Sequence, residues 1–308
     1  MKNLLDKIFP TLSDELIIVI SLIIGLLVTA SLILFLVKKI SPKTNISELA
    51  ARTRSWWIMF IGAVFISYNI SYFFLAFLSF IAFRELYSVL GFREADRGAL
   101  FWGILSIPIQ YYLAYLAWYG AFIIFIPVVM FLVLPLRLVL KGDTHGITKS
   151  MALLQWILML SVFGISHLAY LLSLPELPGF SSGGRGLLLF LVFLTEINDI
   201  MQFIWGKLLG RHKILPKVSP NKTWEGFLGG VISTTVIGYF LGFLTPLSAP
   251  NVILVSALLA IAGFSGDVVI SAIKRDKGIK DMGNSIPGHG GVFDRIDSLS
   301  YTAPVFFH

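Results

Sequence analysis

The residues of this sequence best suited to chemistry lie in one glycine-rich segment near its C-terminus, between Lys274 and Asp297. Glycines there are interspersed with lysines, arginines and aspartates. Glycine lets backbone N–H groups approach an anion closely, and lysine and arginine neutralise its charge. Mg²⁺ bound to a nucleotide prefers one or two carboxylates together with phosphate oxygens. The segment therefore predicts a phosphate site with a metal ion, in which Asp294 and Asp297 can face the same side of a short helix.

Two apolar stretches before this segment carry polar residues that could complete the site. In Leu187–Gly206 one helical stripe contains several of them: Thr195, Asn198, Asp199 and Gln202. Asp267, Ser271 and Lys274 share a second helical face. Charged groups at membrane depth are costly unless they face a partner or a cavity, and they are usually functional. Helix–helix hydrogen bonding is the alternative for the first stripe, and a simple Asp–Lys pair is the alternative for the second.

Two smaller features leave their function open. His289 stands in a Gly-His-Gly-Gly run and could act as a base, donate to a phosphate, or be a turn histidine. The run lacks the Gly-Lys-Ser/Thr ending of a Walker A loop. The loop Ser219–Gly226 could bind anionic lipid headgroups as an ordinary basic loop beside the membrane. It could equally use Lys222 to capture a phosphate at the beginning of the next helix.

The elements that must position these residues are membrane helices. Hydrophobic residues make up 56% of the 308 and charged residues 13%, whereas soluble domains carry about 25% charged residues. There is no cysteine, which excludes disulfides, thiolate nucleophiles and Cys-ligated metals. We expect an all-α, polytopic integral membrane protein with about nine to ten transmembrane helices. The predicted spans are 16–37, 99–118, 121–137, 151–172, 187–206, 226–245 and 251–273.

Basic residues predict how the helices are oriented. Of the 24 lysines and arginines, 21 fall in five clusters, at 38–54, 84–97, 137–149, 207–222 and 274–295. These clusters occupy alternate loops only if 56–87 crosses twice, as two short passes broken near Tyr68-Asn69 or as a re-entrant hairpin. The positive-inside rule then predicts cytoplasmic loops at all five clusters and an extracytoplasmic N-terminus. The stretch Ser298–Phe307 is either a final short helix or a surface segment.

The segment Ser271–Asp297 resembles the signature of the phosphatidate cytidylyltransferases, also called CDP-diacylglycerol synthases. It matches every fixed position of the pattern S-x-(apolar)-K-R-x4-K-D-x-(small)-x2-(apolar)-P-x-H-G-G-(apolar)-x-D-R-(apolar)-D. The loop Ser219–Gly226 is similar to the family's S-P-K-K-T-W-E-G element, with Asn221 in place of a lysine. Two departures are visible. Gln202-Phe203 stand where the family usually has Ala-Tyr, and the helix 16–37 precedes the usual family start.

The resemblance implies transfer of CMP from CTP to phosphatidic acid, giving CDP-diacylglycerol and pyrophosphate. It implies Mg²⁺ as cofactor, alone or with a monovalent cation such as K⁺. Asp267 and Asp294 would be the principal metal ligands, supported by Asp199 and Asp297. Further residues would hold the phosphates and the nucleotide: Ser219, Lys222, Ser271, Lys274, Arg275, Lys280, Asp281, His289 and Arg295. No nucleic-acid partner is implied, and a homodimer stays open.

We therefore expect an N-terminal helix with its basic loop in residues 1–50 and a cytidylyltransferase-like membrane domain in 51–308, with its catalytic half at 187–308. The expected location is the bacterial inner (cytoplasmic) membrane, with the site facing the cytoplasm. Two enzymatic alternatives are a CTP-dependent lipid kinase and a cytidylyltransferase for another lipid phosphate. A cation-coupled transporter is the non-enzymatic alternative, because Glu196, Asp199 and Asp267 all fall within apolar segments.

Overall fold

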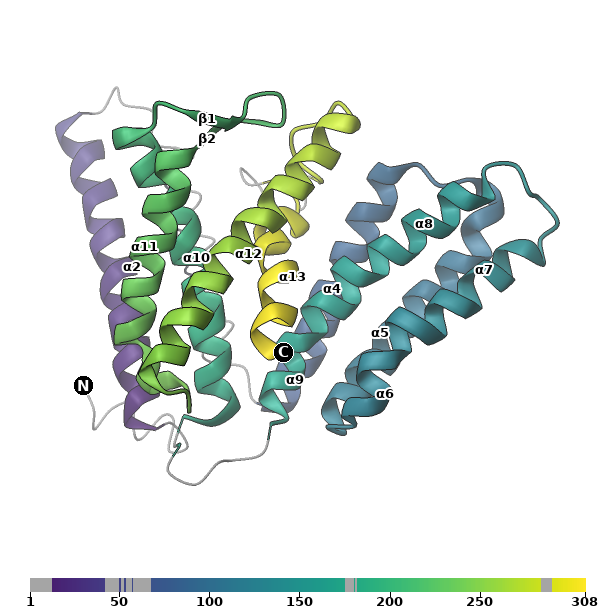
Figure 1. Ribbon diagram of the computed structural model, residues 1–308, viewed down its shortest axis with the longest axis horizontal. Coiled ribbons are helices and arrows are strands. Elements are labelled where there is room, and N and C mark those ends of the chain that lie inside the picture. Colours follow the sequence, from purple (N-terminus) through teal and green to yellow (C-terminus); the bar gives the residue numbers. More distant parts are fainter. Residues whose placement is uncertain are drawn as a thin grey trace.

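The computed structural model describes residues 13–41, 50, 53, 57, 68–174, 180, 182–283 and 290–308. Most of them are helical, and six of the described helices are long and apolar enough to cross a membrane (Figure 1). The prediction of an all-α, polytopic integral membrane protein is thus confirmed. His289 and the first part of the predicted span 56–87 lie outside the described residues.

The helices follow the predicted apolar runs, with ends shifted by a few residues. They are α2 (Asp14–Ile40), α4 (Tyr68–Leu90), α5 (Arg97–Tyr115), α6 (Tyr119–Ile124), α7 (Phe131–Val139), α8 (Ile147–Leu158), α9 (Ile165–Leu172), α10 (Gly183–Leu209), α11 (Trp224–Phe240), α12 (Ala249–Asp276) and α13 (Phe293–Phe307). Short 3-10 turns η1 (Glu94–Asp96) and η4 (Gly242–Leu244) precede α5 and follow α11. Two predicted spans are continuous rods with a π-helical turn inside, η2 (Phe125–Met130) between α6 and α7 and η3 (Met159–Gly164) between α8 and α9. The loop after α10 forms a small antiparallel hairpin of β1 (Lys213–Leu215) and β2 (Ser219–Thr223).

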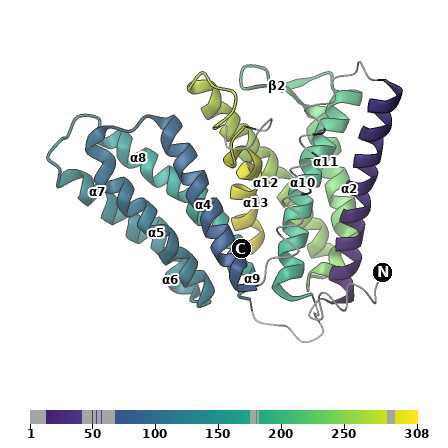
Figure 2. The same ribbon diagram turned by 180° about the vertical axis from the view of Figure 1, so that it is seen from behind.

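The helices form two groups with α13 between them (Figures 1 and 2). One group is the α4–α9 bundle, and the other, the α10–α12 group, has α2 on its outer side. Helix α13 contacts α12 and α10 on one flank and α9, η3 and α4 on the other. The last apolar stretch, for which a surface segment was one possibility, is therefore a helix packed in the interior. It buries Phe293, Leu299 and Ala303.

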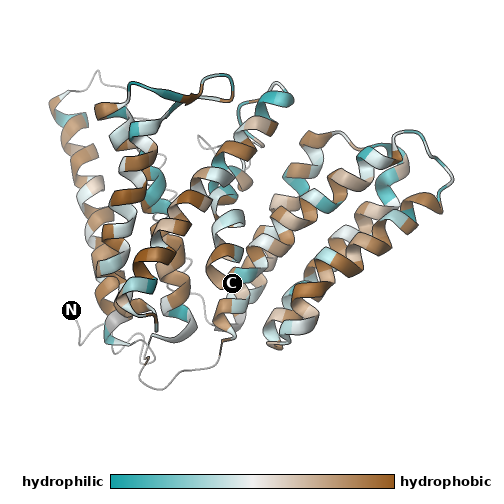
Figure 3. Ribbon diagram, in the orientation of Figure 1, coloured by the Kyte–Doolittle hydropathy of each residue, from teal (hydrophilic) through white to brown (hydrophobic). Residues whose placement is uncertain are grey.

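The described parts of the basic clusters predicted to lie on one side of the membrane do lie at one end of the described helices. In Figures 1 and 2 the C-terminal ends of α2, α4, α7, α10 and α12 all point upward, and the hairpin lies at the same end. Colouring by hydropathy shows the polar residues gathered in these upper loops (Figure 3). Helix α2 ends at this upper end, and α4 begins at the opposite one. The first of the two passes predicted for 56–87 lies largely outside the described residues.

Helices α10 and α11 pack closely because α11 presents glycines to α10. A Cβ atom on Gly230 would lie 2.4 Å from the Gln202 side chain, and one on Gly226 would lie 2.8 Å from the Gln202 carbonyl oxygen. Any larger residue would force the two helices apart. The close approach also lets Thr234 of α11 donate to Asn198 Oδ1 at 3.3 Å. Part of the polar stripe of α10 thus joins α10 to α11 by hydrogen bonding, whereas Asp199 contacts α13.

Candidate active site

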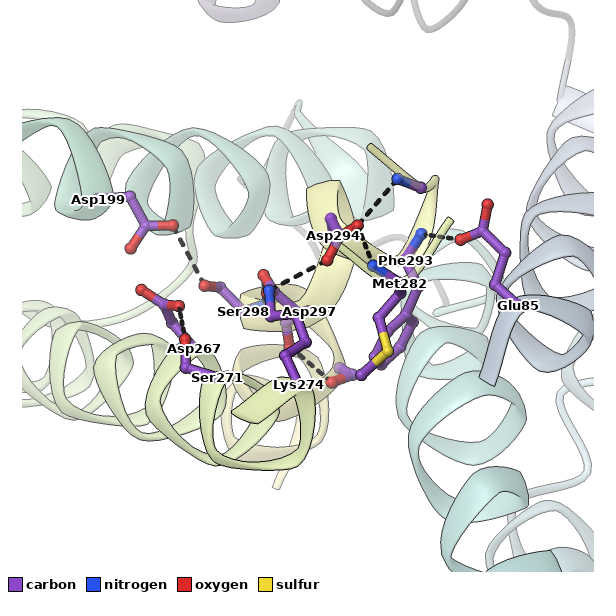
Figure 4. A network of polar contacts seen from close by, with 12 residues as sticks. Glu85, Asp199, Asp267, Ser271, Lys274, Met282, Phe293, Asp294, Asp297 and Ser298 are labelled. Atoms are coloured by element: carbon purple, nitrogen blue, oxygen red, sulfur yellow. Dashed lines mark hydrogen bonds and ion pairs between the residues drawn. The ribbon is translucent and has the colours of Figure 1, made fainter. Parts of the chain in front are cut away.

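Two carboxylates face each other between α10 and α12 (Figure 4). Asp199 projects from α10 and Asp267 from α12. Oδ2 of Asp199 accepts a hydrogen bond from Ser298 Oγ of α13 at 3.2 Å, so three helices meet at this point. Oδ1 of Asp267 accepts one from Ser271 Oγ at 3.2 Å, which the i, i+4 spacing on α12 makes possible.

Lys222 enters this network from the hairpin. Its Nζ lies 2.6 Å from Asp267 Oδ2 and donates to Gln202 Oε1 at 3.0 Å. It also lies 5.3 Å from the centre of the Phe264 ring, whose face attracts cations. The strand is anchored because Thr223 caps α11, its hydroxyl accepting a backbone N–H of the first helical turn at 3.1 Å. The hairpin thus places Lys222 among the carboxylates of α10 and α12.

The second lysine, Lys274, pairs with α13 and not with a carboxylate of its own helix. Its Nζ lies 3.0 Å from Asp294 Oδ1 and 4.0 Å from Asp297 Oδ2. The other oxygen of Asp294 accepts backbone hydrogen bonds from Met282 N at 2.7 Å and Gly291 N at 2.8 Å. Hydrogen bonds to charged groups contribute about 1.5–3 kcal/mol each. Asp294 therefore ties the two described ends of the glycine-rich segment to each other and to α12.

The carboxylates of Asp199, Asp267 and Asp297 are close enough to interact electrostatically. Oδ1 of Asp199 is buried, and no hydrogen-bond donor among the described residues reaches it. No three side chains of metal-binding type, among those the structure describes, form a ready-made metal cluster. A set of hard carboxylate oxygens with one unpartnered member nevertheless fits a divalent cation such as Mg²⁺ in its chemistry. Asp294 fits such a role less well, because protein donors already engage both of its oxygens.

The remaining predicted residues lie around this centre toward the basic end. Arg275 is exposed and donates to the Val218 and Ile279 carbonyls at 3.2 Å each, which ties the hairpin to the end of α12. Lys280 and Asp281 are exposed just beyond it. The structure also places Ser219 opposite Leu215 in the hairpin and Arg295, half-buried, in the first turn of α13. Of these residues, Arg295 is close enough to Asp199 to interact with it electrostatically.

Sequence reasoning missed Glu85, which α4 contributes to the same network. Its Oε1 accepts from Val292 N at 3.0 Å and its Oε2 from Phe293 N at 2.8 Å. The side chain is buried although its helix is one of the six apolar spans. A carboxylate within an apolar helix was the signal that could have identified it.

Comparisons with known proteins bear on what this arrangement does. The family model described as Cytidylyltransferase family matches residues 50–308 of the chain. A protein of Escherichia coli (strain K12) named Uncharacterized protein YnbB is 43% identical over 289 residues, 92% of this chain and 94% of the relative.

Two relatives named Phosphatidate cytidylyltransferase match a smaller part. The one from Staphylococcus haemolyticus (strain JCSC1435) is 39% identical over 126 residues, 40% of this chain and 48% of the relative. The one from Rickettsia bellii (strain RML369-C) is 41% identical over 117 residues, 35% of this chain and 51% of the relative. Each match thus spans about half the length of that relative, while the Escherichia coli protein matches nearly end to end.

Proposed function

This chain belongs to the cytidylyltransferase family, and on that premise we propose that it moves CMP from CTP onto the phosphate of a membrane lipid. The proposed acceptor is phosphatidic acid, and the products are CDP-diacylglycerol and pyrophosphate. Family membership supports a nucleotidyltransferase, and the partial matches to two phosphatidate cytidylyltransferases support this choice of acceptor.

One observation carries the proposal: Asp199, Lys222 and Asp267, from α10, the hairpin and α12, belong to one polar network inside an otherwise apolar helical layer. Their side chains are largely shielded from solvent, with Lys222 18% and Asp267 26% exposed, and charged groups at membrane depth are functional by default. Their position suits a reaction between a soluble nucleotide and a lipid headgroup. Asp199 lies ten residues before the end of α10, which places it roughly 15 Å from that end of the helix at 1.5 Å per residue.

The proposed reaction needs charge neutralisation more than proton transfer. An oxygen of the lipid phosphate, already ionised, attacks the α-phosphorus of CTP. The bond from that phosphorus to the oxygen bridging to the β-phosphate breaks, and pyrophosphate leaves with that oxygen. The obstacle is repulsion between two anions, which fixed cations and in-line positioning overcome. Lys222 and Lys274 would supply positive charge at the centre.

The proposed cofactor is Mg²⁺, which when bound would act as a Lewis acid on the phosphate oxygens. Asp199, Asp267 and Asp297 would hold it, since their carboxylates lie close together and Asp199 has an unpartnered buried oxygen. Asp294 would order the glycine-rich segment through the contacts described above. The exposed cations Arg275 and Lys280 would guide the triphosphate from the aqueous side.

We further propose that the basic end of the helices faces the bacterial cytoplasm and that the N-terminus is extracytoplasmic. The gathering of the described basic loops at one end supports this orientation under the positive-inside rule. The nucleotide would then reach the site from the compartment in which CTP is made.

Mass spectrometry of the products tests the reaction. The purified chain is supplied with CTP, Mg²⁺ and, in separate reactions, phosphatidic acid, an ether-linked analogue, an isoprenyl phosphate or diacylglycerol. The proposal expects CDP-diacylglycerol and pyrophosphate from phosphatidic acid. CDP released from diacylglycerol would indicate the lipid kinase, and a CDP-linked product from another phosphate alone would replace the acceptor. No CDP-linked lipid from any of them would overturn the proposal.

Lys222→Gln tests whether the hairpin lysine belongs to the site. The substitution removes the charge beside Asp267, so we expect a roughly 10²-fold loss of the rate of CDP-lipid formation. Lys207→Gln is the matched control, because Lys207 is exposed at the end of α10 and lies 5.9 Å from the ring of Phe203. Equal activity of the two variants would remove Lys222 from the proposed site.

A further inference from the structure

The N-terminus of α13 is capped by a residue from the other side of the molecule. Val292, the residue that precedes α13, has no side chain that could cap the helix. Instead the two oxygens of Glu85 accept the N–H groups of Val292 and Phe293, at 3.0 and 2.8 Å. A helix begins with four N–H groups that have no partner within the helix, and a carboxylate is well suited to receive them. Here it comes from 207 residues earlier in the chain.

Two glycines of the C-terminal segment make room for this carboxylate. A Cβ atom on Gly291 would lie 2.5 Å from Glu85 Oε2, and one on Gly283 would lie 3.0 Å from Glu85 Oε1. The first distance is shorter than any real contact of a Cβ atom, so a side chain at Gly291 would displace Glu85. The absence of a side chain at these two glycines thus leaves the space that the Glu85 carboxylate occupies.

Glu85 and Asp294 together accept hydrogen bonds from three consecutive backbone N–H groups. The N–H of Gly291 goes to Asp294, and the next two go to Glu85. Figure 4 shows the two carboxylates approaching the beginning of α13 from opposite sides. Asp294 in turn contacts Lys274, and Asp297 lies one turn further along α13. A shift of this first turn would therefore displace the α13 side chains that contact Lys274 and Asp199.

We infer that Glu85 is a positioning residue for the transfer reaction: it holds the first turn of α13 so that Asp294 meets Lys274 and Asp297 faces the Asp199–Asp267 pair. This inference rests on the proposed function for the reaction it serves. It also gives the α4–α9 bundle, which otherwise contributes no charged group to the network drawn in Figure 4, a direct part in ordering the site.

Glu85→Gln is the main test, because it keeps the shape of the side chain. The amide has one acceptor oxygen, so one of the two N–H groups would face an NH₂ group, and the first turn of α13 loses its fixed position. We expect kcat for CDP-lipid formation to fall roughly 10- to 100-fold, with KM for CTP changed less than about threefold, because positioning acts on the reacting geometry. Glu85→Asp, which retains a carboxylate, should recover part of the loss.

Ser79→Ala is the matched control on the same helix. Ser79 is buried and bonds Tyr111 at 2.7 Å within the α4–α9 bundle, far from α13 in its contacts. Its loss should leave kcat within about twofold, while changing thermal stability as much as Glu85→Gln does. If the two variants lose activity equally in proportion to stability, Glu85 is only a structural residue and the inference fails.

A readout independent of activity separates this inference from the proposed function. Amide hydrogen exchange in residues 290–299 should become at least about tenfold faster in Glu85→Gln than in wild type, while exchange in α5 stays unchanged. Wild-type protein that makes no CDP-lipid would overturn the proposed function and leave this prediction standing. An active wild type with unchanged exchange and kcat in the variant would overturn the inference alone.

Gly291→Ala supplies a coupled test. Alone it places a methyl group against Glu85 and should lower kcat and stability. In a Glu85→Ala background the space is vacated, so the same substitution should cost at least about threefold less. Strictly additive effects of the two substitutions would show that Gly291 and Glu85 do not act on each other, contrary to the inference.

Discussion

The α4–α9 bundle and the other half of the molecule, formed by the α10–α12 group and α13, both bury polar side chains among apolar helices. The two halves differ in how these side chains are paired. Between the helices of the first, neutral groups pair: Ser79 bonds Tyr111 at 2.7 Å, and Gln110 donates to Ser166 Oγ at 3.2 Å. The buried ion pair of this bundle, Arg93–Asp96, lies in the loop between α4 and α5. In the second, carboxylates and ammonium groups meet, as Asp267 does with Lys222. Neutral pairs hold helices together at modest cost, whereas charges need a further reason to be buried.

A polar residue within a membrane helix therefore does not by itself indicate an active site. What differs is the pairing between elements, which is neutral in the Ser79–Tyr111 pair and charged in the Asp267–Lys222 pair. Glu85 is the informative exception, because it is charged, belongs to the α4–α9 bundle, and has its described partners in α13. One half thus provides the charged centre and the other fixes the helix that completes it.

Asp267→Asn should give the largest effect of the substitutions considered, because Asp267 lies at the centre of the charged network. The substitution removes the negative charge paired with Lys222 and facing Asp199, so we expect a roughly 10³-fold loss of CDP-lipid formation. The apparent melting temperature should change little, because the loss of one ion pair is offset by relief of repulsion among carboxylates. Product formation is measured by mass spectrometry and melting by intrinsic fluorescence.

Tyr111→Phe is its matched control in the neutral network. It removes the hydrogen bond to Ser79 and should lower the melting temperature by a few degrees while activity stays within about twofold. A large loss of activity in Tyr111→Phe together with little loss in Asp267→Asn would reverse the assignment of roles to the two halves.

Hydropathy and charge predicted the helical layer well because both are local properties. The described helices follow the apolar runs, with α6 and α7 sharing one run and α8 and α9 another. The described parts of the basic clusters gather at one end, because burial and loop charge depend on each residue by itself. The π-helical turns η2 and η3 were not predicted. A π-helical turn changes which backbone groups bond to each other but not which residues are apolar, so hydropathy does not reveal it in Phe125–Met130 or Met159–Gly164.

The structure brings several of the predicted residues into one polar network, but partly in pairs that the sequence did not predict. The helical spacing brought Ser271 to Asp267, but Lys274, on the same predicted face, pairs with Asp294 instead. Which lysine meets which aspartate depends on how helices and hairpin pack, and the spacing within one helix does not contain that information. Glu85 was missed for the same reason, since its partners lie more than 200 residues away.

Asp294→Asn distinguishes residues of the charged network that also stabilise the fold from those that do not. Asp294 is 2% exposed and binds Lys274 and two backbone N–H groups, so unlike Asp267 it supports the fold as well as the site. We expect a roughly 10²-fold loss of CDP-lipid formation, together with a melting temperature lowered by about 4–8 °C. Full activity would remove Asp294 from the site, and an unchanged melting temperature would contradict its role in ordering the glycine-rich segment.

Asp96 offers the smallest effect and tests whether a buried charge in the α4–α9 bundle can be purely structural. It lies in η1 and accepts hydrogen bonds from Arg93, at 2.7 Å, and from Ser150, also at 2.7 Å. Burial alone would raise the pKa of this carboxyl group, but these hydrogen bonds outweigh burial and hold the pKa below its usual 3.8. The group is ionised in the folded protein at neutral pH.

A pKa lowered by folding means that Asp96 stabilises the folded state above its unfolded pKa, and that this stability is lost as the pH falls through the folded pKa. Wild type should therefore lose more thermal stability than Asp96→Asn when the pH is lowered from 6 toward about 3, with CDP-lipid formation at neutral pH unchanged within about twofold. Glu94→Gln is the control, because the Glu94–Arg97 pair is largely exposed and should contribute little. If Asp96→Asn instead abolished activity at neutral pH, the division between a neutral, structural bundle and a charged, reactive half would have to be redrawn to include the loop between α4 and α5.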